Sequence, residues 1–201
     1  MKHLLVFLTI ILVSGCSTLI PRPENVSQYE KWEVHKARLL KLEHWELHGR
    51  IFIQAKNDGF SSTIHWKQQG QTYELGFTAP FNQGIYKLRG SPEKVSIVLP
   101  DSTIRNASDP ESLIKETLGF HFPISGLSYW VRGLPWPKGP SRNIILDQNE
   151  RLAELSQAGW HIKISRYIHI RDIYLPSKLM MENRYLKIKM VVKEWIIPNP
   201  K

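Results

Sequence analysis

The chain has 201 residues and a net charge of +9, from 27 basic and 18 acidic side chains. This length suffices for one domain with a sizeable hydrophobic core. The sequence contains a single cysteine, which excludes an intramolecular disulfide bond.

The N-terminus is predicted to be a signal peptide over residues 1–15. A basic start precedes an apolar run over residues 4–13, which is much shorter than the roughly 20 residues that cross a bilayer. A basic start, a short apolar core and small residues are typical of secretory signals. The motif VSGC that follows resembles the lipobox of bacterial lipoproteins, in which Cys16 becomes the first residue and carries acyl chains. An ordinary signal peptide with a chance cysteine is the alternative.

Residues 16–25 are predicted to be a lipidated tether. The lipobox implies covalent diacylglycerol and an N-acyl chain on Cys16, and no other cofactor is expected. An aspartate after the cysteine usually retains bacterial lipoproteins in the inner membrane, whereas this chain has Ser17. The resemblance therefore implies a protein anchored in the outer membrane by its lipid.

The basic excess persists after the signal is removed. Without Lys2, 26 basic and 18 acidic residues remain, a net charge of +8. A basic cytosolic protein would suggest nucleic acid, but a secreted, tethered protein meets little of it, so no nucleic-acid partner is expected. Anionic lipid head groups or an acidic protein fit better. A generally basic solvated surface is the open alternative.

The first predicted element after the tether is a helix from Ser27 to about Leu42. The sequence SQYE at residues 27–30 has the form of a capping box, in which side chains satisfy free backbone N–H groups. One face of this helix is expected to hold Val26, Tyr29, Trp32, Ala37 and Leu40.

Apolar and polar residues then alternate with period two. This pattern predicts strands over residues 47–55, 63–67, 72–77 and 95–99, separated by turn signals at 57–59, 69–70, 80–84 and 90–92. Closely spaced alternating strands with short turns indicate an antiparallel meander with one apolar face. The turn in FTAPFNQGIYKL, residues 77–88, is unusual because hairpin tips are normally small or polar, whereas this one contains Phe81.

Two short helices are predicted to interrupt the strands. Asp109 offers an N-cap and Pro110 a first helical position, with Gly119 as the stop. Ser125 is expected to cap a second helix, which ends at Gly133 and precedes a loop over residues 135–140. Apolar positions of the two helices are Leu113, Ile114, Leu118, Leu127, Trp130 and Val131.

Alternation resumes over residues 160–170 and 186–192. The predicted fold class is mostly β with helices (α+β). A large, curved antiparallel sheet should form a single domain over residues 26–201, with the helices packed on its apolar face. That face forms either an ordinary core or the lining of a ligand cavity.

No catalytic residues are predicted. The chain lacks G-x-S-x-G, H-E-x-x-H and G-x-x-x-x-G-K-[ST] motifs, although a triad could still assemble in space. Four histidines lie opposite the apolar strand positions and are expected to face solvent without forming a metal site: His48, His65, His161 and His169. This pattern favours binding over catalysis.

Several blocks resemble, in order and over essentially the whole mature chain, the LolB family of outer-membrane lipoprotein receptors. They are WELHGRIFI, IHWKQQGQTYELGFTAPFNQGIYKL, ASDPESLIKETLGFHFPISGLSYWVRGLP and LSQAGWHIKI, followed by LPSKL and LKIKMVVKEW. The most specific pieces are the WVRGLP segment at residues 130–135 and the QAGW turn at residues 157–160.

The resemblance implies a fold, a function and partners. The fold is an unclosed antiparallel β-barrel with short α-helices plugging a hydrophobic cavity. Such receptors accept mature acylated lipoproteins from the periplasmic carrier LolA and insert them into the inner leaflet of the outer membrane, on its periplasmic face. They use no nucleotide, and a monomer is expected. An anchored lipid-binding or envelope-assembly lipoprotein of similar fold is the alternative, and a hydrolase is a distant third.

The resemblance also implies site residues. The family carries an exposed leucine after a proline in a protruding membrane-insertion loop, and that position corresponds to Phe81. Asn82 stands where the family often has glycine, which puts the loop conformation in question. The apolar strand and helix positions would line the acyl cavity: Ile51, Ile53, Trp66, Leu75, Phe77, Ile97, Leu113, Leu127, Trp130, Ile162, Ile164, Ile188 and Met190.

Overall fold

The computed structural model describes residues 28–55, 58–78, 84–119 and 121–199. The signal peptide, Cys16, the tether and Phe81 lie outside these residues. The strands are β1 (His44–Ala55), β2 (Asp58–Gln69), β3 (Thr72–Thr78), β4 (Ile85–Gly90), β5 (Val95–Val98), β6 (Ile104–Ala107), β7 (Ser141–Leu146), β8 (Leu152–Gln157), β9 (Trp160–Ile170), β10 (Ile173–Glu182) and β11 (Leu186–Ile196). The helices are α1 (Gln28–Leu40), α2 (Pro110–Leu118) and α3 (Ile124–Trp130).

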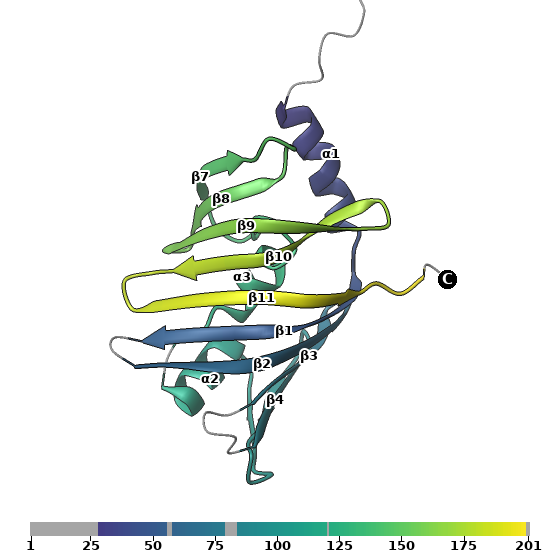
Figure 1. Ribbon diagram of the computed structural model, residues 1–201. Coiled ribbons are helices and arrows are strands. Elements are labelled where there is room, and N and C mark those ends of the chain that lie inside the picture. Colours follow the sequence, from purple (N-terminus) through teal and green to yellow (C-terminus); the bar gives the residue numbers. More distant parts are fainter. Residues whose placement is uncertain (1–27, 56–57, 79–83, 120, 200–201) are drawn as a thin grey trace, which may run out of the picture.

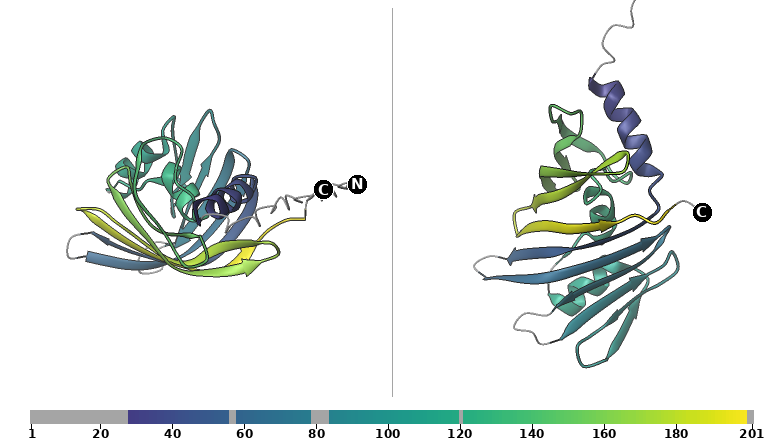
Figure 2. Two further views of the ribbon diagram at one scale, coloured as in Figure 1. Left: turned by 90° about the horizontal axis from the view of Figure 1, so that it is seen from above. Right: turned by 45° about the vertical axis from the view of Figure 1, so that its right-hand side comes forward.

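The strands form one antiparallel sheet in the order β6-β5-β4-β3-β2-β1-β11-β10-β9-β8-β7. Two meanders, β1 to β6 and β7 to β11, meet where β1 pairs with β11 (Figure 1). β6 and β7 are the two edges of the sheet. The segment between these edges carries α2 and α3, and the sheet curves around both helices (Figure 2). The predicted fold class, an unclosed antiparallel barrel with helices, is confirmed.

The pairing of β1 with β11 contains a bulge between His48 and Gly49. A Cβ atom at Gly49 would lie 2.4 Å from the Val191 backbone oxygen, so only glycine fits at this position. Side chains on either side alternate as predicted: Leu47, Ile51 and Ile53 are buried, whereas their neighbours on β1 are half-buried or exposed. The apolar side chains of β1 therefore stay on the inner face of the sheet on both sides of the bulge.

The helices differ from the predictions in detail. α1 ends at Leu40, and its buried face holds Trp32 and Leu39, seven residues apart, whereas Ala37 and Leu40 are exposed. The predicted helix face was therefore wrong at these two positions. Val26 and the Tyr29 side chain lie outside the described part of the chain.

α2 has the predicted caps: the Ser112 N–H donates to the Asp109 carboxylate at 2.7 Å, and Gly119 is left-handed. α3 begins at Ile124 after Pro123, so Ser125 is not its cap. The backbone N–H of Ser125 instead donates to the Glu111 carboxylate at 2.9 Å. This hydrogen bond joins α3 to α2.

Four strands were not predicted: β6, β7, β8 and β10. β6 and β7 are sheet edges whose residues are mostly exposed, so they lack the apolar alternation that marks a half-buried strand. β10 alternates poorly because its register with β9 shifts around Lys178, which leaves the consecutive residues Leu175, Pro176 and Ser177 all buried.

The two family-like segments at residues 130–135 and 157–160 meet through the side chain of Gln157, which is 2% exposed. Its Oε1 accepts hydrogen bonds from Trp130 Nε1 at 3.0 Å and the Trp136 backbone N–H at 2.8 Å. Its Nε2 donates to the carbonyls of Trp136 and Gly139 and to the Ser141 hydroxyl, at 2.6, 3.1 and 3.0 Å. One buried amide thus connects α3, the following loop, β7 and β8.

Replacement of Gln157 by leucine should destabilise the protein by about 3 kcal/mol, because several buried polar groups lose their partner at once. Gln69 on β2 is exposed, and Gln69→Leu should change stability by less than about 0.5 kcal/mol. Urea denaturation followed by tryptophan fluorescence gives both values. Equal stability of the two variants would contradict the structural role of the amide.

His35 is on α1 and faces β10. Its ring centroid lies 6.1 Å from that of Trp32 on the same helix and 6.5 Å from that of Tyr174 on β10. Burial lowers the pKa of His35, and the positive charges of Arg151 and Arg38 lower it further. Its Nε2 has no hydrogen-bond partner. The folded state therefore holds this imidazole neutral against the sheet.

Because the pKa of His35 is lower in the folded protein than the roughly 6.5 of an unfolded chain, unfolding takes up a proton as the pH falls. The contribution of His35 to stability should be complete above about pH 6.5 and be lost as the pH falls through the folded-state pKa. Urea midpoints at pH 7.5 and 5.5 should thus differ less in His35→Phe than in the wild type. The exposed His44, changed to phenylalanine, is the control and should leave the difference unaltered.

Candidate functional site

The concave face of the sheet gathers the predicted cavity residues. Twelve of the thirteen are buried: Ile51, Ile53, Trp66, Leu75, Ile97, Leu113, Leu127, Trp130, Ile162, Ile164, Ile188 and Met190. Phe77 is half-buried. The alternation in the sequence therefore identified one continuous apolar surface, although it left open whether this surface is a packed core or a cavity lining.

One small apolar cavity lies between β1–β3 and α2. Its lining comprises Ile51, Ile53, Phe60, Ser62, Ile64, Leu75, Phe77, Ile114, Leu118 and Phe122. The free volume is about 30 Å³, which holds little more than a water molecule. Among the described residues that form this lining, none has an ionisable side chain, so this part of the wall suits an aliphatic group.

Four of the predicted residues border this cavity, namely Ile51, Ile53, Leu75 and Phe77. On α2, Ile114 borders the cavity, whereas the predicted Leu113 beside it does not. Sequence reasoning missed Phe60, Ile64, Leu118 and Phe122 as members of the lining. Ile64 and Leu118 already stood in predicted apolar sets, so their spacing was the available signal.

The remaining predicted side chains border neither this cavity nor the groove beside α3. They are buried in the apolar interior: Ile97, Leu113, Leu127, Trp130, Ile162, Ile164, Ile188 and Met190. The Trp130 and Trp160 rings lie 6.3 Å apart, and the Trp45 ring lies 5.4 Å from Trp195. Aromatic rings therefore pack against one another in this part of the interior, whereas the cavity next to α2 is lined mainly by aliphatic side chains and phenylalanines.

A wider groove of about 650 Å³ opens beside α3, and its lining is partly polar. Trp66 is the only predicted cavity residue on its walls, which also include Trp45, Tyr73, Tyr129 and Arg132. The Trp45 Nε1 and the Tyr73 hydroxyl are buried there without a hydrogen-bond partner. Burial raises the pKa of Tyr73, so its hydroxyl stays protonated and able to donate.

Arg132 fixes one wall of the groove. Its Nη1 donates to the Leu42 carbonyl at 2.9 Å and to the Leu39 carbonyl at 3.3 Å, and its Nε donates to the Ser128 carbonyl at 3.0 Å. Leu39 is in the last turn of α1, Leu42 follows that helix, and Ser128 is on α3. A positive charge near the C-terminal end of a helix is favoured by the helix dipole. Burial lowers the pKa of Arg132, and its guanidinium holds α1 against α3.

The hairpin that carries Phe81 begins at the rim of the apolar cavity. Phe77, which borders the cavity, stacks on Tyr86 across the β3–β4 ladder at 5.1 Å between ring centroids. Gly84 has a φ of +113°, and a Cβ atom there would lie 2.6 Å from the Pro100 Cβ. The base of this hairpin is therefore tightly packed, while Phe81 itself lies outside the described residues.

The four strand histidines do not all stay apart. Two of them, His48 and His65, lie with Glu46 on the outer face of β1 and β2, with all three ligand atoms within 4.8 Å of one another. The sequence-based expectation that the histidines form no metal site is not tested by these positions.

Among the described residues, no helix is long and apolar enough to cross a membrane.

Residues 43–195 match the family described as Outer membrane lipoprotein LolB. The chain is 34% identical to the outer-membrane lipoprotein LolB of Ectopseudomonas mendocina over 197 residues, 97% of this chain and 96% of that protein. The LolB of Pseudomonas fluorescens is 34% identical over 198 residues, 98% and 96% of the two chains.

The fold also resembles a solved structure. A LolA superfamily protein from Nitrosomonas europaea superposes with a TM-score of 0.55, covering 88% of this chain and 96% of that one. Because the sequences are only 8% identical, this likeness concerns the fold alone.

The cavity next to α2 can be tested by enlarging it. Ile114→Ala should cost about 2–4 kcal/mol of stability and increase the affinity for a fluorescent fatty acid several-fold, because the removed carbon atoms widen the apolar space. Leu113→Ala removes an equally buried side chain from the same helix, away from the cavity. It should cost a similar amount of stability and leave the affinity unchanged. Equal gains in both variants would show that loosening of the helix, not the cavity, controls binding.

Proposed function

Since the chain belongs to the LolB family of outer-membrane lipoproteins, we propose that it is the receptor that accepts mature lipoproteins from the periplasmic carrier LolA. It then inserts them into the inner leaflet of the outer membrane, as a binding protein without catalytic residues. The observation that supports this most directly is the apolar cavity between β1–β3 and α2, in whose lining the described residues include no ionisable group. An acyl chain is the kind of ligand that such a lining favours.

The physical need for a cavity follows from the cargo. Each CH₂ group of an acyl chain gains about 0.8 kcal/mol on leaving water, so several long chains exposed together would cost tens of kcal/mol. A protein-lined route keeps them out of water between carrier and bilayer. No nucleotide is required if the receptor binds the chains better than the carrier does and the bilayer binds them better still.

The cavity must widen to take a chain, because a free volume of about 30 Å³ has room for very few water-sized groups, far fewer than the carbon atoms of an acyl chain. α2 is the element to move. It covers the cavity with the apolar side chains of Ile114 and Leu118, and the Glu111 carboxylate links it to α3. α3 is held more firmly. Trp130 donates a hydrogen bond to Gln157, and Arg132, just after the helix, donates to the carbonyls of Leu39 and Leu42 at and beyond the end of α1. Displacement of α2 alone would open the apolar space and leave the rest of the fold in place.

The anchor and the loop have separate roles in this proposal. Cys16, modified with diacylglycerol and an N-acyl chain, anchors the protein on the periplasmic face of the outer membrane. The protein acts there as a monomer. Phe81 enters the bilayer and directs release toward it. Transfer of one phenylalanine from water to lipid is worth about 1.5–3 kcal/mol, which is too little for an anchor and enough to favour docking. Phe77, at the end of β3 that precedes this loop in the chain, borders the cavity.

A two-step assay tests both the receptor and the loop. LolA loaded with a labelled lipoprotein is mixed with the purified protein, transfer is scored, and liposomes are then added to score insertion. Wild-type protein should complete both steps. Phe81→Glu should accept the lipoprotein and fail to insert it, because a carboxylate resists entry into lipid.

Phe81→Leu is the control and should complete both steps, since leucine is also apolar. Failure of the wild type to accept lipoprotein, together with binding of free phospholipid, would favour the alternative of an anchored lipid-binding protein. Normal insertion by Phe81→Glu would remove the membrane role of the loop and leave the receptor role intact.

A further inference from the structure

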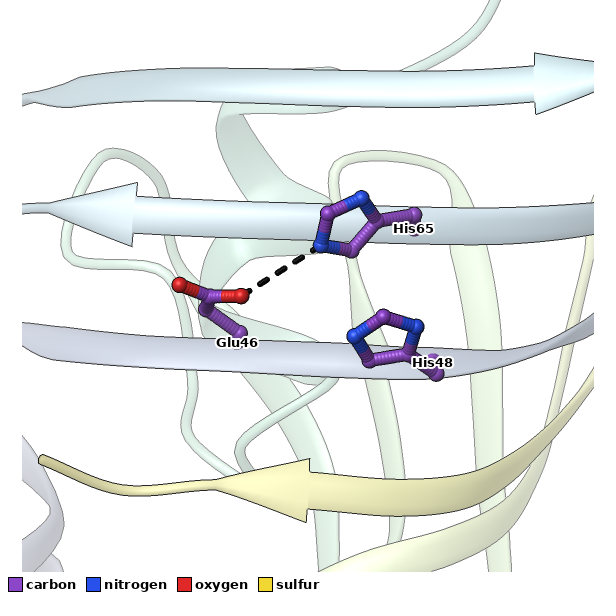
Figure 3. A group of neighbouring side chains, drawn as sticks. All are labelled: Glu46, His48 and His65. Atoms are coloured by element: carbon purple, nitrogen blue, oxygen red, sulfur yellow. Dashed lines mark hydrogen bonds and ion pairs between the residues drawn. The ribbon is translucent and has the colours of Figure 1, made fainter.

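The outer face of the sheet carries a cluster of side chains that the transfer of lipoproteins does not use. Glu46 and His48 are two residues apart on β1, and His65 lies directly opposite His48 on β2. The two imidazole rings stack with centroids 4.2 Å apart, and the His65 Nε2 lies 3.4 Å from a Glu46 carboxylate oxygen. Figure 3 shows the three side chains projecting from the same side of the two strands.

These groups match a divalent metal in kind and in number. Two imidazole nitrogens and one carboxylate oxygen form the three-ligand set of many zinc sites, in which water or another group takes the fourth position. A tetrahedral ion at about 2.1 Å from each ligand separates the ligand atoms by roughly 3.4 Å. The three atoms already lie within 4.8 Å of one another, so small side-chain rotations suffice.

The backbone and the surrounding charges permit such a site. β1 and β2 are paired along their whole length, so Glu46, His48 and His65 are mounted on a rigid ladder. Lys67 occupies the other Glu46 oxygen at 3.0 Å and leaves the oxygen that faces His65 available. Glu194 of β11 pairs with His48 and adds negative charge to the same row. Lys67 and Arg50 oppose it, which should weaken the affinity without abolishing it.

The same sheet contains a natural counterpart that lacks one ligand. On β8 and β9, Glu154 pairs with Lys163, and Ser156 pairs with His161. The Glu154 carboxylate lies 2.7 Å from Lys163 and 3.7 Å from His161, as Glu46 does from Lys67 and His65 at 3.0 and 3.4 Å. The two groups therefore share one arrangement and differ in that Ser156 stands where the first has His48.

We propose that Glu46, His48 and His65 form a surface site for a divalent transition-metal ion, with zinc as the natural candidate and one coordination position open to solvent. Imidazole and carboxylate ligands suit zinc, and Cu²⁺ would bind more tightly to the same groups in vitro. This inference departs from the expectation that the strand histidines bind no metal. It is independent of the receptor function, because the ligands lie on the face opposite the apolar cavity. A bound ion would join β1 to β2, two strands whose inner residues line that cavity.

The test is titration of the mature, lipidated protein without a histidine tag, in detergent, with Zn²⁺ alone in a calorimeter. Lipidated protein is used because a free Cys16 thiol would itself bind zinc. Wild type should bind one Zn²⁺ per chain. Both His48→Ala and His65→Ala should weaken binding at least about 10-fold. His161→Ala is the matched control from the counterpart group and should bind as the wild type does.

A second variant tests the same geometry by adding a ligand to the Glu154 group, while Glu46, His48 and His65 stay unchanged. Ser156→His completes the counterpart group and should raise the stoichiometry from one Zn²⁺ to two. Circular dichroism verifies that every variant is folded. The proposal is overturned if the wild type shows no saturable Zn²⁺ binding, if His161→Ala weakens it as much as His65→Ala does, or if Ser156→His adds no site.

Discussion

A sheet with one apolar face that does not close on itself must have that face covered, because leaving it in water costs free energy in proportion to its area. In this protein the cover is the segment between the two edge strands, β6 and β7, which carries α2 and α3. The buried amide of Gln157 holds the end of that segment by bonding to Trp130 and to the loop that leads into β7. The position of the helices, and with it the shape of the interior, depends on this attachment.

The cover is attached unevenly, and the cavity lies at its weaker end. Around α3, the Gln157 amide and the Arg132 guanidinium form directional hydrogen bonds, and the Trp130 and Trp160 rings pack together. Around α2, contact with the sheet is made by aliphatic side chains such as Ile114 and Leu118, which pack without directional bonds. A protein that must admit a flexible hydrocarbon and release it again benefits from such a division, because one half keeps the fold while the other half changes its packing.

The outer face of the sheet is built differently. Carboxylates, lysines and histidines face one another across β1–β2 and again across β8–β9, at distances between 2.7 and 3.7 Å. Exposed ion pairs of this kind contribute little to stability. Their placement matters for what the surface can bind. The group on β1–β2 has His48 at the position where the group on β8–β9 has Ser156, and this difference supplies the third ligand of the proposed metal site.

The sequence by itself determined the apolar strand face, the caps of α2 and the family, because each depends on neighbouring residues. Alternation on β1 follows from the two-residue period of a strand, and the Asp109 and Gly119 caps from the local geometry of helix ends. Only the tertiary structure decided which part of the apolar face is a cavity: Ile114 borders it and Leu113 does not, since this depends on how α2 lies over β1–β3. The partners of Gln157 and the meeting of His48 with His65 were likewise set by strand register and by contacts between distant segments, which no local pattern encodes.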